Sequence, residues 1–187
     1  MQIEALADRY PSIEDLRQRA RRRIPHFAWE YLDSGTGLET GLQANRKTLD
    51  AVQLTPGFLR DPVPPDLTTA VFGLTYSAPF GIAPVGLSGL MWPGSELMLA
   101  RAARGADIPY SLSTVAAENP EPVAQAADGN GWFQLYSLSD ARSEADILRR
   151  AADAGYKVLL VTVDVPGPSA RERQRKAGFH PRQKMNA

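Results

Sequence analysis

Small hydrogen-bonding residues end four apolar runs of this sequence, and their types and spacing suit a flat, neutral ligand. The runs end in Pro84-Val85-Gly86, Ser113-Thr114, Gln134 with Tyr136, and Thr162 with Asp164. A glycine lets a flat ring approach the backbone closely, and hydroxyl and amide groups pair with the polar edge of a heteroaromatic ring. Taken singly, each residue is better explained by local backbone hydrogen bonds. Their recurrence at four successive strand ends favours the ligand.

Other kinds of site chemistry have little support in the sequence. The chain has no cysteine, which excludes disulfides, thiolate metal sites and cysteine nucleophiles. His26 and His180 show no metal-binding spacing, and we predict no metal site. The stretch GLSG lacks the spacing of a nucleophile elbow. Asp164 ends an apolar strand, where catalysis and capping of the next loop are about equally supported.

Alternating strands and helices must position these strand ends. The apolar runs predict strands at 80–84, 108–113, 132–136 and 158–164, and helical spacing predicts helices at 94–104, 120–127 and 143–154. We expect a Ser143/Asp146 cap and a Gly155 stop on the last helix. Such alternation implies a parallel sheet with helices outside it. The last run has no polar alternation, which predicts burial on both faces. The count leaves open a small α/β sheet or half of a (β/α)8 barrel.

The remaining segments divide the chain into three predicted regions. Helix signals begin at Ser12 and continue at 26–33 and 38–49, which predicts an N-terminal helical cap over residues 1–50. Prolines crowd residues 51–78, which we interpret as a connector with room for a small hairpin. Residues 79–187 then form the incomplete barrel half. The charged tail after the fourth strand predicts a loop.

The balanced charge gives no general reason for nucleic-acid binding. The chain has 187 residues, with 21 Lys and Arg against 21 Asp and Glu. The basic run RQRARRR is more typical of a solvated helix face than of a membrane or partner surface, which stay open as alternatives. The N-terminus lacks the pattern of a secretory signal, and the longest apolar stretch is too short to span a bilayer. We therefore predict a cytoplasmic location.

Several segments together resemble the FMN-dependent α-hydroxy-acid dehydrogenases and oxidases. They are YLDSG, PVGLSGLMWPGSE, LST, WFQLY, AGYKVLLVTVD and RERQRKAGF, and they are most similar to the mandelate-dehydrogenase type. The resemblance implies a (β/α)8 barrel, FMN as cofactor, and oxidation of an L-2-hydroxy acid to a 2-keto acid. It also implies a quinone or another electron acceptor, a homo-oligomer such as a tetramer, and in some members attachment to the periphery of the inner membrane.

The resemblance also assigns site residues. Tyr31 and Arg171 match residues that hold the substrate carboxylate, and Tyr136 matches a tyrosine near both the flavin and the substrate hydroxyl. Backbone that backs the flavin ring corresponds to Pro84, Val85 and Gly86. Side chains that hydrogen-bond the ring correspond to Ser113, Gln134 and Thr162. The chain departs from the family at two positions. Val85 stands where the family usually has Thr, and Gln174 stands where the family has Asp. Gly86 in place of Ala is associated with dehydrogenases that react poorly with oxygen.

The family's catalytic histidine, second substrate arginine, flavin-contacting lysine and phosphate loops belong to the second barrel half, which this sequence does not contain. We therefore expect no catalytic base in this chain, and we expect the chain alone to be inactive. The leading hypothesis is the N-terminal half of an FMN-dependent 2-hydroxy-acid dehydrogenase. The alternative is a non-catalytic half-barrel that acts as an interaction or assembly subunit, because its sheet edges are open.

Overall fold

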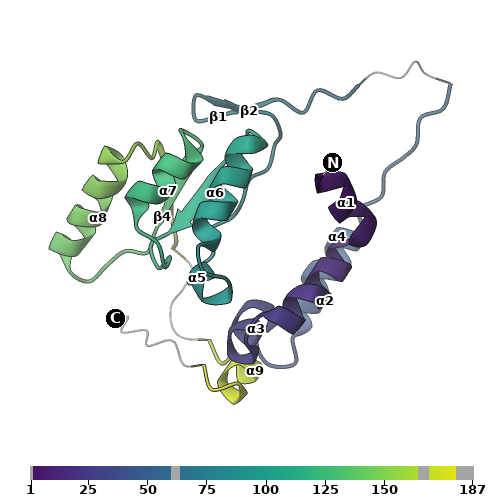
Figure 1. Ribbon diagram of the computed structural model, residues 1–187, viewed down its shortest axis with the longest axis horizontal. Coiled ribbons are helices and arrows are strands. Elements are labelled where there is room, and N and C mark those ends of the chain that lie inside the picture. Colours follow the sequence, from purple (N-terminus) through teal and green to yellow (C-terminus); the bar gives the residue numbers. More distant parts are fainter. Residues whose placement is uncertain (1, 60–63, 164–168, 180–187) are drawn as a thin grey trace. The chain divides into compact units, whose positions relative to one another are not determined.

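The computed structural model describes residues 2–59, 64–163 and 169–179, which form two compact units described separately (Figure 1). The first unit comprises residues 2–53 and 169–179, and the second comprises residues 54–59 and 64–163. None of the helices within these ranges has the length and apolar composition of a membrane-spanning segment.

The first unit contains four N-terminal helices and one helix from near the C-terminus. These are α1 (Gln2–Arg9), α2 (Ile13–Arg23), α3 (His26–Asp33), α4 (Thr40–Asp50) and α9 (Glu172–Lys176). The predicted start of α2 is confirmed, because the Ser12 hydroxyl accepts from the Asp15 amide at 3.2 Å and the Asp15 carboxylate accepts from the Ser12 amide at 3.0 Å. Helix α4 begins two residues later than predicted, because Glu39 before it has a left-handed φ of 59°.

Two helices of the first unit were not predicted. Helix α1 precedes the expected cap signal, and helix α9 occupies the charged tail that we predicted as a loop. A helix as short and charged as α9 is not stable by its own propensity. Side-chain contacts with α3 and the turn after it, described below, supply its stability, and they are invisible in the local sequence.

A parallel sheet forms the centre of the second unit. Strands β3 (Tyr110–Ser113), β4 (Gly131–Leu135) and β5 (Val158–Val161) pair in the order β3-β4-β5. Helices α6 (Ser95–Gly105), α7 (Pro120–Ala127) and α8 (Ala141–Asp153) follow the α/β alternation, and the short α5 (Ser88–Met91) precedes α6. Helix α7 packs against β3 and β4, and α6 packs against α7 and β3; Figure 1 shows α7 beside β4. The predicted α/β class, a parallel sheet with helices outside it, is confirmed. Within the described residues the sheet is open and forms no closed barrel.

The two faces of this sheet differ in chemistry. Tyr110, Leu112, Phe133 and Leu135 are buried against the helices together with alanines of α6, α7 and α8. The alternate residues of β3 and β4 point to the opposite face, because successive side chains of a strand alternate. That face carries polar and aromatic groups, and in a closed barrel of this class it would be the interior.

The first predicted strand is reduced to a single bridge. Ile82 pairs with Tyr110 in parallel, its amide donating to the Pro109 carbonyl at 2.8 Å and its carbonyl accepting from the Ser111 amide at 3.0 Å. Pro84 lacks the amide that would continue the ladder. The segment therefore follows β3 without becoming a full strand.

The last strand and the helix before it also differ from expectation. Leu159 and Val161 are 47% and 54% exposed, so β5 is not buried on both faces within the described residues. It is the outer strand of the described sheet, and no described strand covers its free side. The N-cap of α8 is Asp140, whose carboxylate accepts from the Ser143 amide at 3.1 Å, and not the predicted Ser143/Asp146 pair. Gly155, with a φ of 95°, follows the end of α8 as predicted.

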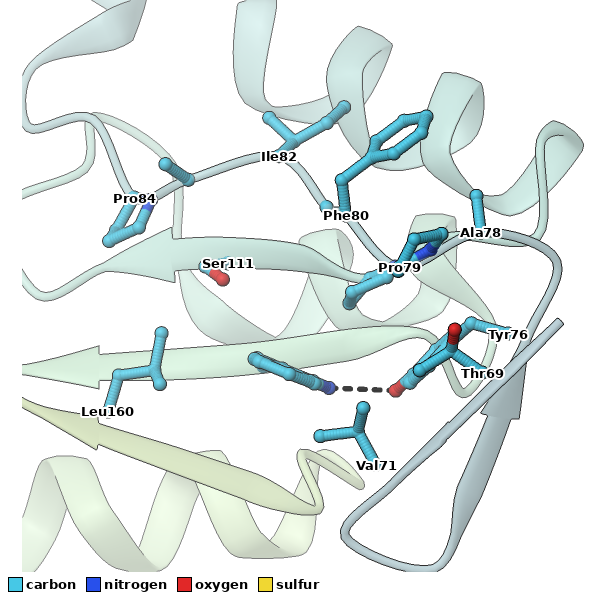
Figure 2. Close-up of a pocket in the computed structure, with 14 residues that line it drawn as sticks. Thr69, Val71, Tyr76, Ala78, Pro79, Phe80, Ile82, Pro84, Ser111 and Leu160 are labelled. Carbon is cyan, nitrogen blue, oxygen red and sulfur yellow. Dashed lines mark hydrogen bonds between the residues drawn. The ribbon is translucent and has the colours of Figure 1, made fainter. Parts of the chain in front are cut away.

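An antiparallel hairpin packs against the inner face of the sheet. Strands β1 (Thr69–Val71) and β2 (Leu74–Tyr76) are joined by Phe72 and Gly73, which both have positive φ angles. Phe72 packs edge-on against Trp132 with ring centroids 5.8 Å apart. The Trp132 indole donates to the Tyr76 hydroxyl at 2.8 Å, as the dashed line in Figure 2 shows. These contacts fix the hairpin on β4.

Candidate functional site

Three predicted cofactor residues form a hydrogen-bonded row across the carboxyl ends of the three strands. The Ser113 hydroxyl donates to Gln134 Oε1 at 3.0 Å, and Gln134 Nε2 donates to Thr162 Oγ1 at 2.8 Å. We call these three residues the polar row. Ser113 pairs with Gln134 in the sheet register, and Thr162 follows β5. Ser113 and Gln134 are buried, at 5% and 3% exposure, and the row is therefore held rigidly.

Each member of the polar row keeps hydrogen-bonding capacity beyond its contacts within the row. A primary amide has two N–H donors and an oxygen with two lone pairs, and a hydroxyl both donates and accepts. Gln134 uses one N–H and one lone pair inside the row. The row therefore offers uncharged donors and acceptors along one edge, which is the chemistry that the polar edge of an isoalloxazine ring requires.

Thr114 connects the polar row to the predicted substrate residue Tyr136. Its hydroxyl donates to the Gln134 carbonyl at 2.5 Å and accepts from the Tyr136 amide at 3.1 Å. The sequence places this threonine at a predicted strand end but gives no prediction of a site role for it. Its position fixes the backbone just after β4, and Tyr136 there is half-buried.

The predicted flavin-backing segment lies beside β3 through the Ile82 bridge. Val85 is 41% exposed, and the amide of Leu87 donates to the Val115 carbonyl at 2.9 Å. The backbone of Pro84, Val85 and Gly86 is thus attached to the β3 end on both sides, by Ile82 before it and Leu87 after it. The structure brings this segment and the polar row into the same unit, at the same edge of the sheet.

An apolar cavity of about 360 Å³ lies beneath this edge, between the hairpin, residues 78–84 and the inner face of the sheet (Figure 2). Ser111, Trp132 and Leu160 contribute the sheet side, and Pro84 lines the cavity as well. Within residues 2–59, 64–163 and 169–179, no three histidine or acidic side chains gather as metal ligands would. The inner face therefore combines an apolar interior with an uncharged polar rim.

The two predicted carboxylate-binding residues meet in the first unit. The Arg171 guanidinium lies over the Tyr31 ring, 5.4 Å from its centroid. Its Nη2 donates to the Tyr31 carbonyl at 2.6 Å and to the Ser34 carbonyl. Phe179 packs edge-on against the same ring at 5.2 Å. The tyrosine ring and the arginine are thus held as one group before any ligand binds.

Arg173 anchors this group through three carboxylates. Its guanidinium lies 2.7 Å from Glu30, 3.1 Å from Asp33 and 2.9 Å from Glu39. The hydrogen bond to Glu30 is the main cause that raises the pKa of Arg173. Burial would raise the pKa of Asp33, but hydrogen bonds from Arg17 and Arg173 lower it below its ordinary value. Because Arg173 was not singled out in the sequence, this anchor was missed.

Replacing Arg173→Met should lower the unfolding free energy of the first unit. Breaking a buried pair costs about 3–5 kcal/mol, but Arg173 is 39% exposed and solvent screens its charge, so we expect about 1–2 kcal/mol. The pKa of Asp33 is lower in the folded state than in the unfolded state. The stability that its ionised carboxylate adds is therefore complete above the unfolded-state pKa and is lost as the pH falls through the folded-state pKa. The difference between the two proteins should therefore shrink below about pH 4.

Urea unfolding at neutral and acidic pH measures this difference. Arg175→Met, an exposed arginine on the same helix, is the matched control and should change the unfolding free energy by less than about 0.5 kcal/mol. Equal losses for the two variants at neutral pH would mean that the three-carboxylate anchor contributes nothing specific.

The fold and the site define an α/β protein of the (β/α)8 class with an uncharged polar rim. A family profile described as FMN-dependent dehydrogenase matches residues 20–187, and the chain belongs to this family. FMN is the cofactor of the family by that description, and the polar row has the donor chemistry to fit it.

Relatives and solved structures agree with this assignment. The chain is 41% identical over 172 residues to 4-hydroxymandelate oxidase of Amycolatopsis orientalis, covering 91% of this chain and 47% of the relative. It is 39% identical over 168 residues to L-lactate dehydrogenase of Caulobacter sp. strain K31, covering 90% and 44%. A mandelate oxidase crystallised with 3,3-difluoro-2-hydroxy-3-phenylpropionic acid has a TM-score of 0.85 at 38% identity, covering 93% and 52%. The chain thus spans about half the length of the relatives it matches.

Proposed function

We propose that this chain supplies the cofactor-facing N-terminal half of an enzyme that oxidises an L-2-hydroxy acid to a 2-keto acid with FMN. The polar row is the observation that carries the proposal, because three uncharged side chains from three strands present one hydrogen-bonding edge. Relatives named for hydroxymandelate and lactate support the substrate class.

The residues of this chain would hold the cofactor from two sides. Ser113, Gln134 and Thr162 would pair with the polar edge of the ring, and the backbone of Val85 and Gly86, with Pro84, would lie against its face. When bound, FMN supplies the two-electron acceptor for the oxidation. The polar row and the Pro84–Gly86 backbone are both attached to β3. They would therefore hold the ring in one orientation with little loss of conformational entropy when it binds.

The substrate carboxylate would be held by Tyr31 and Arg171, with Tyr136 near the substrate hydroxyl. Among the described residues, the hydrogen bonds of the Arg171 side chain all use Nη2, so Nη1 and Nε stay available for a carboxylate. A phenol and a guanidinium fix a carboxylate in one orientation, which in turn fixes the α-carbon for reaction. The tyrosine needs no further ordering, because Phe179 and Arg171 already pack against its ring.

Further properties of the whole enzyme follow from the same proposal. The base that accepts a substrate proton would come from the later half of the barrel, so the chain alone would bind FMN without turnover. Gly86 favours a dehydrogenase that passes electrons to a quinone or another acceptor. A homotetramer, a cytoplasmic location and contact with the inner membrane remain part of the proposal.

One observation favours the alternative of a non-catalytic assembly subunit. The outer strand of the described sheet exposes Leu159, Val161 and the following Val163, which is 89% exposed. An open parallel edge with apolar side chains readily pairs with another strand. Both the enzyme half and the assembly subunit would use a partner that covers this edge. Only the enzyme half would bind FMN, so cofactor binding distinguishes the two functions.

Titration of the purified chain with FMN tests the proposal. We expect saturable 1:1 binding with quenching of the flavin fluorescence, because the polar row and the Pro84–Gly86 backbone lie in one unit. Addition of L-mandelate or L-lactate should leave the visible flavin absorbance unchanged, since the proposal places the base in the later half of the barrel. A chain that emerges free of flavin from gel filtration at saturating FMN would favour the assembly subunit instead. Bleaching of bound FMN by a hydroxy acid would contradict the expected inactivity.

A further inference from the structure

Two loops that flank the proposed flavin site approach each other unusually closely. The first follows the flavin-backing segment and runs into the first turn of α5, which contains Gly89, and the second follows β3. The Leu87 amide donates to the Val115 carbonyl at 2.9 Å. At Gly89 an added Cβ would lie 2.5 Å from the Ala117 Cβ, which is closer than two carbons can approach. Glycine at this position therefore permits the contact between the loops.

Glu96 lies behind both loops and is completely buried, with 0% exposure. Its Oε1 accepts from the Gly89 amide at 2.9 Å and from the Ala117 amide at 3.1 Å, one donor from each loop. Its Oε2 accepts from the Ser95 hydroxyl at 3.3 Å. Among the described residues no cation pairs with this carboxylate.

A buried charge without a counterion is costly, and a protein keeps one only where hydrogen bonds compensate. Burial would raise the pKa of Glu96, but hydrogen bonds from its own amide, from the Ser88 hydroxyl and from the Ala117 and Gly89 amides lower it below its ordinary value. The carboxylate is therefore ionised at neutral pH, where its bonds to the amides are strongest.

We propose that Glu96 is a positioning residue that ties the loop carrying Val85 and Gly86 to the loop after Ser113. Through this tie it sets the spacing between the face-contacting backbone and the polar row, and so shapes the cofactor site without touching the ligand. The inference rests on the proposed function. The hydrogen bonds make this role testable by substitution, because the single oxygen Oε1 of Glu96 accepts from both loops.

That single-oxygen geometry predicts which substitutions retain the tie. In Glu96→Gln the amide oxygen can take the place of Oε1 and accept from both loops, while its N–H group faces the Ser95 hydroxyl. Glu96→Ala removes both bonds and leaves two amides without their acceptor. We expect FMN affinity to fall about 10- to 100-fold in Glu96→Ala, which corresponds to two lost hydrogen bonds, and to fall less than about threefold in Glu96→Gln.

The loop contact itself is tested by a paired substitution. Gly89→Ala places a methyl group against Ala117, so the loops must separate and FMN affinity should fall about tenfold or more. Adding Ala117→Gly removes the opposing methyl group, and the added Cβ then meets only the Glu96 oxygens at 3.3 and 3.4 Å, which a shift of a few tenths of an ångström accommodates. The double variant should then recover to within about threefold of wild-type affinity, a rescue that general destabilisation would not give.

Amide hydrogen exchange of the FMN-free chain, followed by NMR, is the second readout. The Gly89 and Ala117 amides should be protected in wild type and in Glu96→Gln, and should exchange faster in Glu96→Ala. If Glu96→Ala binds FMN as tightly as wild type, or if Glu96→Gln loses as much affinity as Glu96→Ala, the positioning role is wrong while the proposed function stands. A wild-type chain with protected amides but no FMN binding would overturn the proposed function, and with it the cofactor role of Glu96.

Discussion

Gly81→Ala should destabilise the second unit by about 2–3 kcal/mol and should also weaken FMN binding. An added Cβ would lie 2.5 Å from Cγ and 2.7 Å from the carbonyl oxygen of Pro109. Neither atom can move aside, because one belongs to a rigid ring and the other accepts the Ile82 amide at 2.8 Å. The segment must therefore leave β3, which breaks the Ile82 bridge and displaces the Pro84–Gly86 backbone.

Urea unfolding and FMN titration of Gly81→Ala measure the two effects. Gly105→Ala is the matched control, since it lies at the end of α6 with no atom within 4 Å of an added Cβ. The control should be neutral or stabilising by up to about 1 kcal/mol. If Gly81→Ala unfolded at the same urea concentration as the control, the contact between this segment and Pro109 would be wrong.

Gln134→Leu should weaken FMN binding about 100-fold, the largest effect of any single change in the polar row. Leucine has nearly the volume of glutamine but no polar atom, so the Ser113 and Thr162 hydroxyls lose their shared partner. The flavin edge would also face an apolar group. Loss of two or three hydrogen bonds in a buried site costs about 2–3 kcal/mol, and each 1.4 kcal/mol is a factor of ten.

The same change elsewhere in this unit controls for general effects. Gln125 is exposed on α7, and Gln125→Leu should leave the FMN dissociation constant within about twofold of wild type. The folded state of Gln134→Leu is checked by circular dichroism, since β4 also carries the buried Phe133. Unaltered FMN affinity in a folded Gln134→Leu protein would exclude the polar row as the ring-binding edge.

Local patterns predicted most elements of the second unit because its signals lie close together in the chain. Helix α7 has the predicted bounds, and β3 and β4 differ from prediction by one or two residues. Their apolar runs and the proline at the start of α7 act over a few residues, which a sequence shows directly. Two segments differ from the prediction. Helix α9 forms because of long-range contacts to α3, and the first predicted strand is reduced to a bridge because Pro84 cannot continue the ladder.

The sequence by itself determined the alternation of strands and helices, the four polar strand ends and the resemblance that assigned Tyr31, Gln134 and Arg171. Only the tertiary structure decided how these residues connect. The bond from Gln134 to Thr162 spans 28 residues of chain, and that from Arg171 to Tyr31 spans 140. No local pattern encodes such distances. Glu96 is an ordinary acidic residue in the first turn of a helix when judged from the sequence. Its buried carboxylate becomes a tether only in the folded chain, where it accepts from Gly89, seven residues away, and from Ala117, 21 residues away.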